Sequence, residues 1–395
     1  MTTDQPVNGK KDIRGQRFAK LYLENWRNFP KAELDLKYRV FLVGPNAAGK
    51  SNLLEVFRFL HDIVSVGGGL QQAVKNHGGV SSIRSLAARQ KPDIVVRAEV
   101  VDEKQNERVS YELRFAQDNL RRPLVRKEEV IRNGKQLFLR PDDSDRQDTE
   151  RLTQTYLEQV NVNKEFRDIV EFFGSIRYLH IVPQLVREPD RSVGKHNDPF
   201  GGDFLEQIAN TTEKTRSSRL RRIQEALKVA VPQLTEIGMF KDTKGTPHLR
   251  GKYQHWRPQG AWQTEEQFSD GTLRLLGLLW AVLDGRGPLL LEEPELSLHP
   301  EVVRFIPQLF ARIQRHTGRQ IILSTHSAEL LRDEAIGLDE VFLLQPGKEG
   351  SEVQAASELS DVKTLLDGGV PLPEIIMPKT KPESAEQLPL FGEWL

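Results

Sequence analysis

The chain has 395 residues, carries 56 basic and 56 acidic side chains, and contains no cysteine. Its length exceeds what one hydrophobic core usually supports, so we expect two lobes or one domain with a large insertion. The balanced charge identifies no charged partner, and the lack of cysteine excludes disulfides, cysteine-ligated zinc and thiol catalysis. No apolar run approaches the roughly 20 residues of a membrane span, and residues 1–15 lack the apolar core of a signal peptide. We therefore expect a cytoplasmic protein with a flexible polar segment at residues 1–15 and no membrane contact.

The first strong pattern along the chain is a strand, a glycine-rich turn and a helix. Strand spacing is present at 18–23 and 32–36, and a third apolar run, 38–43, leads into the sequence GPNAAGKS at 44–51. An amphipathic segment follows at 52–63. This is the context that the phosphate-loop motif G-x-x-x-x-G-K-[ST] requires.

Each residue type in this motif has a physical task. Gly44 and Gly49 lack a Cβ, so the backbone can turn sharply and bring its N–H groups against phosphate oxygens. The helix that begins near Gly49 directs its positive end at the same anion. Lys50 supplies a charge to the β- and γ-phosphates, and the Ser51 hydroxyl is placed to ligate Mg²⁺. The alternative is a chance match on a tight turn, and the full motif in this context favours binding of a nucleoside triphosphate.

Weaker patterns fill the middle of the chain. Glycine-rich stretches at 67–69 and 78–79 indicate loops. The expected elements are antiparallel strands at 94–101, 107–115 and 124–131, a helix at 153–173 and a further strand at 175–183.

A basic helix is expected at 213–231, and a solvated helix face explains its charges better than a DNA contact does. The following segment, 233–263, is irregular or β-structured and contains Trp256 and Trp262 beside several cations. These rings could stack on bases or on a partner, but we expect them to be buried in a small β-lobe.

Dense alternation of strands and helices resumes after Phe268. The expected elements are a nearly all-apolar helix at 272–283, strands at 288–291, 319–323 and 340–344, and helices at 299–315 and 327–331. Such alternation predicts an α/β fold with a mostly parallel sheet and a phosphate site at the carboxyl ends of its strands.

Two adjacent carboxylates, Glu292 and Glu293, end the apolar run at 288–291. Buried carboxylates are costly unless a cation or a reaction uses them. Glu292 would hold Mg²⁺ through its water shell, and Glu293, pointing to the other side, would orient and polarise the attacking water. A strand that ends at the surface with two solvated acids is the alternative.

Two further turns are candidates for contacts with phosphate. His326 follows the next strand, where an imidazole N–H could donate to charge that develops on the γ-phosphate. Ser269 can cap the helix at 272–283, and Gly271 permits close approach of the backbone, so this turn offers a second anion-binding helix end. A plain helix cap is the alternative for Ser269, and a structural role is the alternative for His326.

These motifs together resemble the ATP-binding-cassette ATPases, and within them the SMC and RecF branch of chromosome-maintenance and repair ATPases. The matching segments are Walker A at 44–51, the signature turn at 268–272, Walker B at 289–293, the D-loop at 296–299 and the switch histidine His326. The opening segment at 23–29, which contains Asn25-Trp26-Arg27, is similar to the start of that branch, whereas transporter cassettes place a base-stacking tyrosine there.

The resemblance implies a P-loop NTPase with an ABC/SMC-like head and a mixed sheet, ATP and Mg²⁺ as ligands, and a head-to-tail dimer. In that dimer Ser269 and Gly271 would reach the γ-phosphate held by the other copy. The remaining implied site residues are Asn25, Arg27, Asn46 and Asn52 at the nucleotide and Ser51, Glu292 and Gln184 at the metal, with Gln184 as the candidate glutamine loop. Catalysis would fall to Glu293 and His326.

Departures from the family pattern bear on activity and organisation. Asp270 replaces a usual glycine and Glu292 a usual aspartate, which leaves the rate of hydrolysis open. The head is expected at 16–101 and 266–345. The intervening 102–265 lacks long heptad runs and is expected to form a compact α+β lid or short arm. Residues 346–395 form a tail.

Among relatives, the chain is similar to stand-alone ATPases of bacterial two-gene anti-phage cassettes, and to overcoming-lysogenization-defect proteins without their nuclease domain. This implies a dimeric switch or motor that acts on DNA or on a DNA-directed effector, in defence or DNA repair, with a neighbouring-gene effector or nuclease as partner. A slow nucleotide-gated scaffold that sequesters a toxic effector is the alternative, and a transporter module is disfavoured. The segment 387–391 resembles peptides that dock on the replication sliding clamp, although it could instead pack on its own ATPase.

Overall fold

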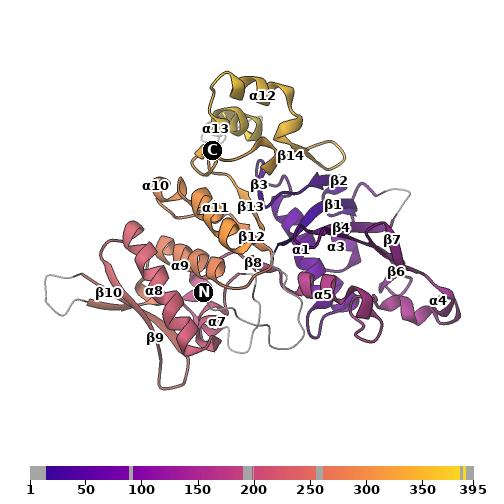
Figure 1. Cartoon of the computed structure of the whole chain (residues 1–395), viewed down its shortest axis with the longest axis horizontal. Coiled ribbons are helices and arrows are strands. Elements are labelled where there is room, and N and C mark those ends of the chain that lie inside the picture. Colours follow the sequence, from indigo (N-terminus) through magenta and orange to yellow (C-terminus); the bar gives the residue numbers. More distant parts are fainter. Residues whose placement is uncertain are drawn as a thin grey trace, which may run out of the picture. The chain divides into compact units, whose positions relative to one another are not determined.

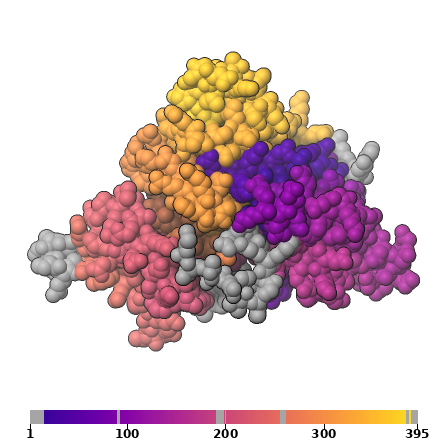
Figure 2. Space-filling view, in the orientation of Figure 1, coloured from indigo at the N-terminus to yellow at the C-terminus, as the bar shows by residue number. Residues whose placement is uncertain are grey.

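The computed structural model describes residues 15–88, 92–189, 198, 200–254, 261–382 and 386–387, which are coloured in Figures 1 and 2. The chain divides into two compact units. Unit 1 comprises residues 1–176, 286–288 and 310–395, and unit 2 comprises residues 177–285 and 289–309.

Unit 1 contains a six-stranded antiparallel sheet in the order β2-β1-β4-β5-β6-β7. Its strands are β1 (Gln16–Trp26), β2 (Phe29–Asp35), β4 (Ile94–Asp102), β5 (Glu107–Gln117), β6 (Pro123–Arg132) and β7 (Lys135–Arg140). The strands expected at 94–101, 107–115 and 124–131 are thereby confirmed. Since β4 pairs with β5 in this sheet, the expected boundary near residue 102 falls inside one sheet, and residues 102–176 belong to unit 1.

A second sheet of unit 1 carries the phosphate-loop strand. β3 (Arg39–Val43) runs parallel to both β13 (Ile321–Thr325) and β14 (Val341–Pro346), while β15 (Ser351–Ala355) pairs with β14 in the antiparallel sense. The helices of this unit are α1 (Lys50–Val64), α2 (Leu70–Asn76), α3 (Val80–Ile83), α4 (Asp143–Gln147), α5 (Arg167–Gly174), α12 (Ser360–Asp367) and α13 (Leu372–Ile376). In the core between α1, α5 and β1, the ring of Phe18 lies 4.8 Å from that of Phe57 and 5.0 Å from that of Phe172.

Unit 2 combines a parallel strand pair with a small antiparallel sheet. Its elements are β8 (Arg177–Leu179), α6 (Pro183–Val186), α7 (Phe204–Asn210), α8 (Glu213–Ala230), β9 (Leu234–Lys241), β10 (Pro247–Tyr253), β11 (Ala261–Thr264), α9 (Asp270–Leu283), β12 (Leu289–Glu292) and α10 (Pro300–Val303). β8 and β12 are parallel, and β11-β10-β9 form the antiparallel sheet, whose β9 contacts α8. The division between the units falls within α11 (Ile306–Thr317).

The helix expected at 153–173 is wrong for most of its length, because the only α-helix there is α5, preceded by a 3₁₀ helix at Asn163–Phe166. The buried carboxylate of Glu128 accepts hydrogen bonds from the backbone amides of Tyr156 and Leu157, the closest at 2.8 Å. These amides therefore donate to a side chain of β6 and not to backbone carbonyls within a helix. The buried Arg140 completes the arrangement by pairing with Glu128 and Asp145.

The glycine-rich stretches at 67–69 and 78–79 are turns and loops as expected, with α2 between them. Two smaller expectations change. The helix expected at 327–331 is only a 3₁₀ turn at Leu330–Arg332. Part of the tail is folded, as β15, α12 and α13. The clamp-like peptide at 387–391 lies outside the described residues except for Gln387, which is exposed.

Candidate nucleotide site

The phosphate loop connects the carboxyl end of β3 to the first turn of α1. Gly49 has a φ of 96°, a left-handed conformation that L side chains rarely adopt. A Cβ on Gly49 would lie 2.2 Å from Asn28 Nδ2, and a Cβ on Gly44 would lie 2.4 Å from the Leu344 carbonyl oxygen. Gly49 is thus required by its backbone conformation, and both glycines are required by close packing within unit 1.

Lys50 is held inside the loop. Its side chain is buried, and Nζ donates to the carbonyl oxygens of Gly44 at 2.9 Å and Pro45 at 3.0 Å. Asn46 and Ser51 are exposed on the same loop. A buried ammonium beside a helix N-terminus and a glycine turn fits an anionic oligophosphate, and the exposed Ser51 hydroxyl is an oxygen donor of the kind that Mg²⁺ prefers.

The segment before β2 supports the loop through a residue that the sequence did not single out. Asn28 Nδ2 donates to the Ala48 carbonyl at 3.2 Å, and Asn28 Oδ1 accepts from Asn52 Nδ2 at 2.8 Å. Trp26 Nε1 donates to the Asn52 carbonyl at 2.8 Å. No local pattern points to Asn28, because its partners lie 20 or more residues away in the chain.

The two residues expected beside the nucleotide in this segment have partners elsewhere in unit 1. Asn25 Nδ2 donates to the Asp93 carbonyl at 2.8 Å. The Arg27 guanidinium pairs with Glu55 at 3.0 Å and donates to the His77 carbonyl at 3.2 Å. Asn28 and Asn52 therefore bond each other beside the phosphate loop, whereas Asn25 and Arg27 bond residues outside it.

A buried charge cluster lies along α1 behind the loop. His77 bonds Glu55 at 2.7 Å through Nδ1 and Asp62 at 3.2 Å through Nε2. Burial alone would lower the pKa of His77, but the bonds to Asp62 and Glu55 raise it above its ordinary value. Burial would likewise raise the pKa of Glu55, yet the His77 bond and the Arg58 charge lower it to about 2. Two further side chains join the cluster: Arg27 pairs with Glu55, and His61 contacts Asp62.

His326 lies at the same sheet edge as the phosphate loop. β13 is parallel to β3, and Thr325 is in register with Val43. The residues that follow, His326 and Gly44, therefore leave neighbouring strands side by side, as expected for the carboxyl ends of a parallel sheet.

The acidic pair belongs to unit 2. Glu292 ends β12, and its carboxylate accepts a hydrogen bond from the Tyr178 hydroxyl of the parallel strand β8. Glu293 has a φ of 42°, an uncommon conformation for a residue other than glycine and one that clusters at functional sites. Tyr178 thus contacts the acidic pair, and no local sequence pattern singled it out.

The turn before α9 has the geometry of a true helix cap. Ser269 Oγ accepts from the Thr272 amide at 3.2 Å. A Cβ on Gly271 would lie 2.5 Å from the Ser297 carbonyl oxygen, so contact with the D-loop of the same chain already requires glycine there. Asp270 is ion-paired with Arg187 at 2.5 Å, and Arg187 also donates to the Phe268 carbonyl at 2.8 Å.

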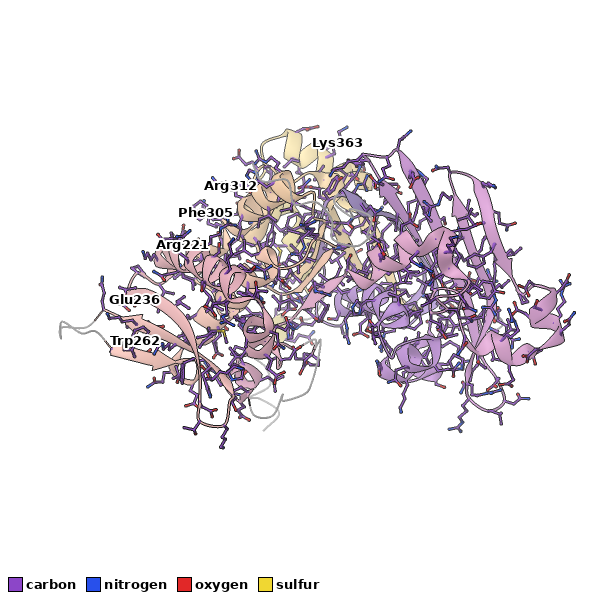
Figure 3. The ribbon with its side chains drawn as sticks, turned by 60° about the horizontal axis from the view of Figure 1, so that its bottom comes forward. Arg221, Glu236, Trp262, Phe305, Arg312 and Lys363 are labelled. Atoms are coloured by element: carbon purple, nitrogen blue, oxygen red, sulfur yellow. The ribbon has the colours of Figure 1, made fainter. Side chains whose placement is uncertain are left out.

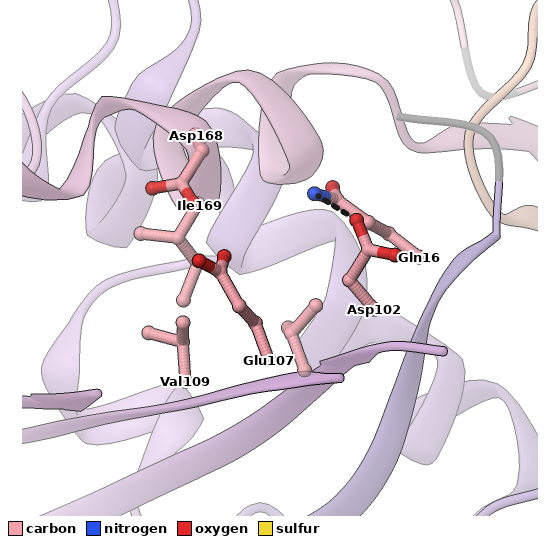
Figure 4. A pocket seen from close by; sticks show the side chains of 7 residues that line it. Gln16, Asp102, Glu107, Val109, Asp168 and Ile169 are labelled. Carbon is pink, nitrogen blue, oxygen red and sulfur yellow. Dashed lines mark hydrogen bonds between the residues drawn. The ribbon is translucent and has the colours of Figure 1, made fainter. Parts of the chain in front are cut away.

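Gln184 is exposed in the first turn of α6, after β8. Among the described residues, no group of three or more His, Asp or Glu side chains is arranged to hold a metal ion. A small cavity in unit 1, drawn in Figure 4, is lined by three carboxylates, Asp102, Glu107 and Asp168, and Arg132 is paired with the last two. Its volume of about 10 Å³ suits one water molecule and not a nucleotide.

Comparison with known families assigns the chain to one protein family. Residues 39–332 match the model of the family described as "AAA domain, putative AbiEii toxin, Type IV TA system". The chain belongs to this family. The match spans the phosphate loop, the turn at 268–272, the acidic strand and His326, and it begins after the opening segment at 23–29.

Curated relatives match over part of the chain. The methionine import ATP-binding protein MetN of Leifsonia xyli is 33% identical over 88 residues, which are 22% of this chain and 25% of that protein. The energy-coupling factor transporter ATP-binding protein EcfA2 of Staphylococcus aureus is 26% identical over 197 residues, 45% of this chain and 68% of that protein. The chain thus spans a quarter of the length of the first relative and about two thirds of the second.

Solved structures of low identity share the fold. An Smc head bound to the C-winged helix domain of ScpA superposes with a TM-score of 0.54 at 14% identity, covering 86% of this chain and 97% of that chain. The Smc head domain of Pyrococcus furiosus, with an extended coiled coil and bound to the C-terminal domain of ScpA, gives 0.54 at 12% identity, covering 90% and 100%. The chain therefore has the P-loop ABC/SMC-like ATPase fold. None of its described helices has the length and apolar character that crossing a membrane requires.

Proposed function

We propose that this protein binds and hydrolyses ATP and acts as a dimeric switch in which each copy completes the other's site. The observation that carries ATP binding is the buried Lys50 ammonium inside a loop whose two glycines are both required by packing. Membership of the AAA-type family supports nucleotide chemistry in general.

In the proposed reaction, Lys50 and the loop amides bind the β- and γ-phosphates. Ser51 and Glu292 would hold Mg²⁺, with Gln184 as a further candidate ligand, and the ion when bound neutralises phosphate charge. Glu293 orients the attacking water and accepts its proton, while the His326 N–H donates to charge that develops on the γ-phosphate. Ser269 and the backbone at Gly271 of the second copy close the site.

The test is the Glu293→Gln variant, which keeps the size of the side chain but cannot accept the proton. We expect phosphate release to fall about 100-fold or more, while ATP binding persists and holds two copies together. Light scattering during size-exclusion chromatography should give the mass of one chain without nucleotide and of two chains with ATP. The Glu293→Gln, Lys50→Ala double variant is the control and should remain monomeric. A Glu293→Gln protein that binds ATP and stays monomeric contradicts the proposal.

The partner of the switch is the less constrained part of the proposal. DNA, or a DNA-directed effector in anti-phage defence or repair, remains our first candidate. The second candidate is a slow nucleotide-gated scaffold that holds a toxic protein; the family description names a putative AbiEii toxin of a type IV toxin–antitoxin system. ATP turnover measured with and without DNA separates the two, because stimulation by DNA favours the switch. Association with membranes would instead favour a role like that of the transporter relatives.

A further inference from the structure

The small sheet of unit 2 exposes an aromatic ring that we expected to be buried. Trp262 on β11 is 48% exposed, so the expectation of burial is wrong for this residue; Trp256 lies outside the described residues. The reason is strand alternation. Leu249 and Gly251 of β10 face the core, whereas Arg250 and Lys252 alternate with them, and Trp262 is paired with Lys252.

The outward residues form a row of rings and cations across the sheet, which we call the outer row: Lys252, Trp262, Arg250, Phe240 and His248. Trp262 is labelled on this sheet in Figure 3. Arg250 Cζ lies 4.8 Å from the centre of the Trp262 ring and 5.9 Å from that of Phe240. The ring of His248 stacks on Phe240 at 5.3 Å, with 23° between the planes.

Two of the three basic side chains on this face already have acidic partners. Lys252 is paired with Glu236 at 3.1 Å, and His248 is paired with the buried Glu265 and lies 3.8 Å from Asp242. No carboxylate among the described residues pairs with Arg250, whose guanidinium is exposed between two rings. Arg250 is therefore left to interact with an external anion.

We propose that the outer row binds single-stranded nucleic acid, with bases stacked on Trp262 and phosphates held by Arg250 and Lys252. A flat sheet face with aromatic rings at stacking distance from cations suits unpaired bases, because every base has a π-face and a neighbouring phosphate. A duplex keeps its bases stacked on one another and cannot use the rings in this way. A protein partner would have to cover Arg250 with a carboxylate or leave it desolvated and unpaired.

Two other surfaces give weaker grounds for a binding site. The groove beside α2 has a volume of about 750 Å³ and contains Lys75 and Arg122, but Arg122 is already paired with Asp118 and Glu150. The exposed cations of α8, including Arg221, lie on an element that contacts the sheet through β9 and offer no ring for stacking. Arg221 therefore serves as a charge control for Arg250 in unit 2.

The test measures fluorescence anisotropy of labelled oligo(dT) and oligo(U) of about 16 nucleotides with the full chain, without ATP. We expect Trp262→Ala and Arg250→Gln each to weaken binding about tenfold or more, and Trp262→Phe to retain most of it. Phe305→Ala, which removes another exposed ring of unit 2, and Arg221→Gln should bind as the wild type does. A duplex of the same length should bind more weakly than either single strand.

Three results would overturn the proposal: no binding of either oligonucleotide by the wild type, unchanged binding by Trp262→Ala and Arg250→Gln, or a larger loss in Arg221→Gln than in Arg250→Gln. A protein that binds the wild type but not Trp262→Ala, while the oligonucleotides fail to bind, would assign the face to a protein partner instead. Thermal unfolding of each variant establishes that it is folded. Lys50→Ala is assayed in parallel and should bind the oligonucleotides normally, so failure of ATP binding and failure of this proposal are distinguishable.

Discussion

At the scale of single residues, Asn28 supports the phosphate loop from outside its motif. It bonds the Ala48 carbonyl and Asn52, and its amide nitrogen lies where a Cβ on Gly49 would be. We expect Asn28→Ala to weaken ATP binding about 30-fold, because two hydrogen bonds of about 1 kcal/mol each no longer hold the loop. Titration of a fluorescent ATP analogue measures the change.

Ser351→Ala is the matched control for Asn28. The Ser351 hydroxyl accepts from Asn28 Nδ2 at 2.6 Å, on the side chain of Asn28 and not on the loop itself. ATP affinity should therefore stay close to that of the wild type in Ser351→Ala. Equal affinity of Asn28→Ala and the wild type would show that the loop holds its shape without Asn28.

At the scale of elements, α1 is joined to the segment after α2 by the cluster of Glu55, Asp62 and His77. The pKa of His77 is raised in the folded chain, so its contribution to stability is complete below about pH 6.5 and is lost as pH rises through the raised value. The pKa of Glu55 is lowered to about 2, so its contribution is present above pH 4.5 and is lost as pH falls toward 2. The cluster therefore stabilises the fold most between pH 4.5 and 6.5.

We expect His77→Gln to lower the free energy of unfolding by about 1–3 kcal/mol near pH 6, since two buried carboxylates lose a charged partner. The difference from the wild type should shrink as pH rises through the raised pKa of His77. Urea denaturation between about pH 5 and pH 9 measures both curves. His316→Gln, at an exposed position on α11, is the control and should leave the curve unchanged. A difference that is constant with pH would contradict a charged His77.

At the scale of the whole molecule, the sequence predicted features formed by one continuous segment and missed contacts between segments that are far apart in the chain. The strand, turn and helix around Lys50 follow from one run of residues. The contacts of Asn28 with the loop, of Tyr178 with Glu292 and of Gly271 with Ser297 join distant segments, and no local pattern encodes them. The prediction of a helix at 153–173 was wrong because the amides of Tyr156 and Leu157 donate to the carboxylate of Glu128 on β6. The prediction that Trp262 is buried was wrong because composition does not tell which face of a strand is buried.

The central claim is that two copies each complete the other's site, and a mixing experiment tests it most directly. Lys50→Ala removes the phosphate-binding cation and Ser269→Arg blocks the signature turn, so each variant alone should be inactive. Mixed in equal amounts, half of the dimers would combine an intact loop from one copy with an intact turn from the other, and ATP hydrolysis should recover to roughly a quarter of the wild-type rate. A mixture that stays as inactive as its components, while both remain folded and Ser269→Arg still binds ATP, would contradict the account.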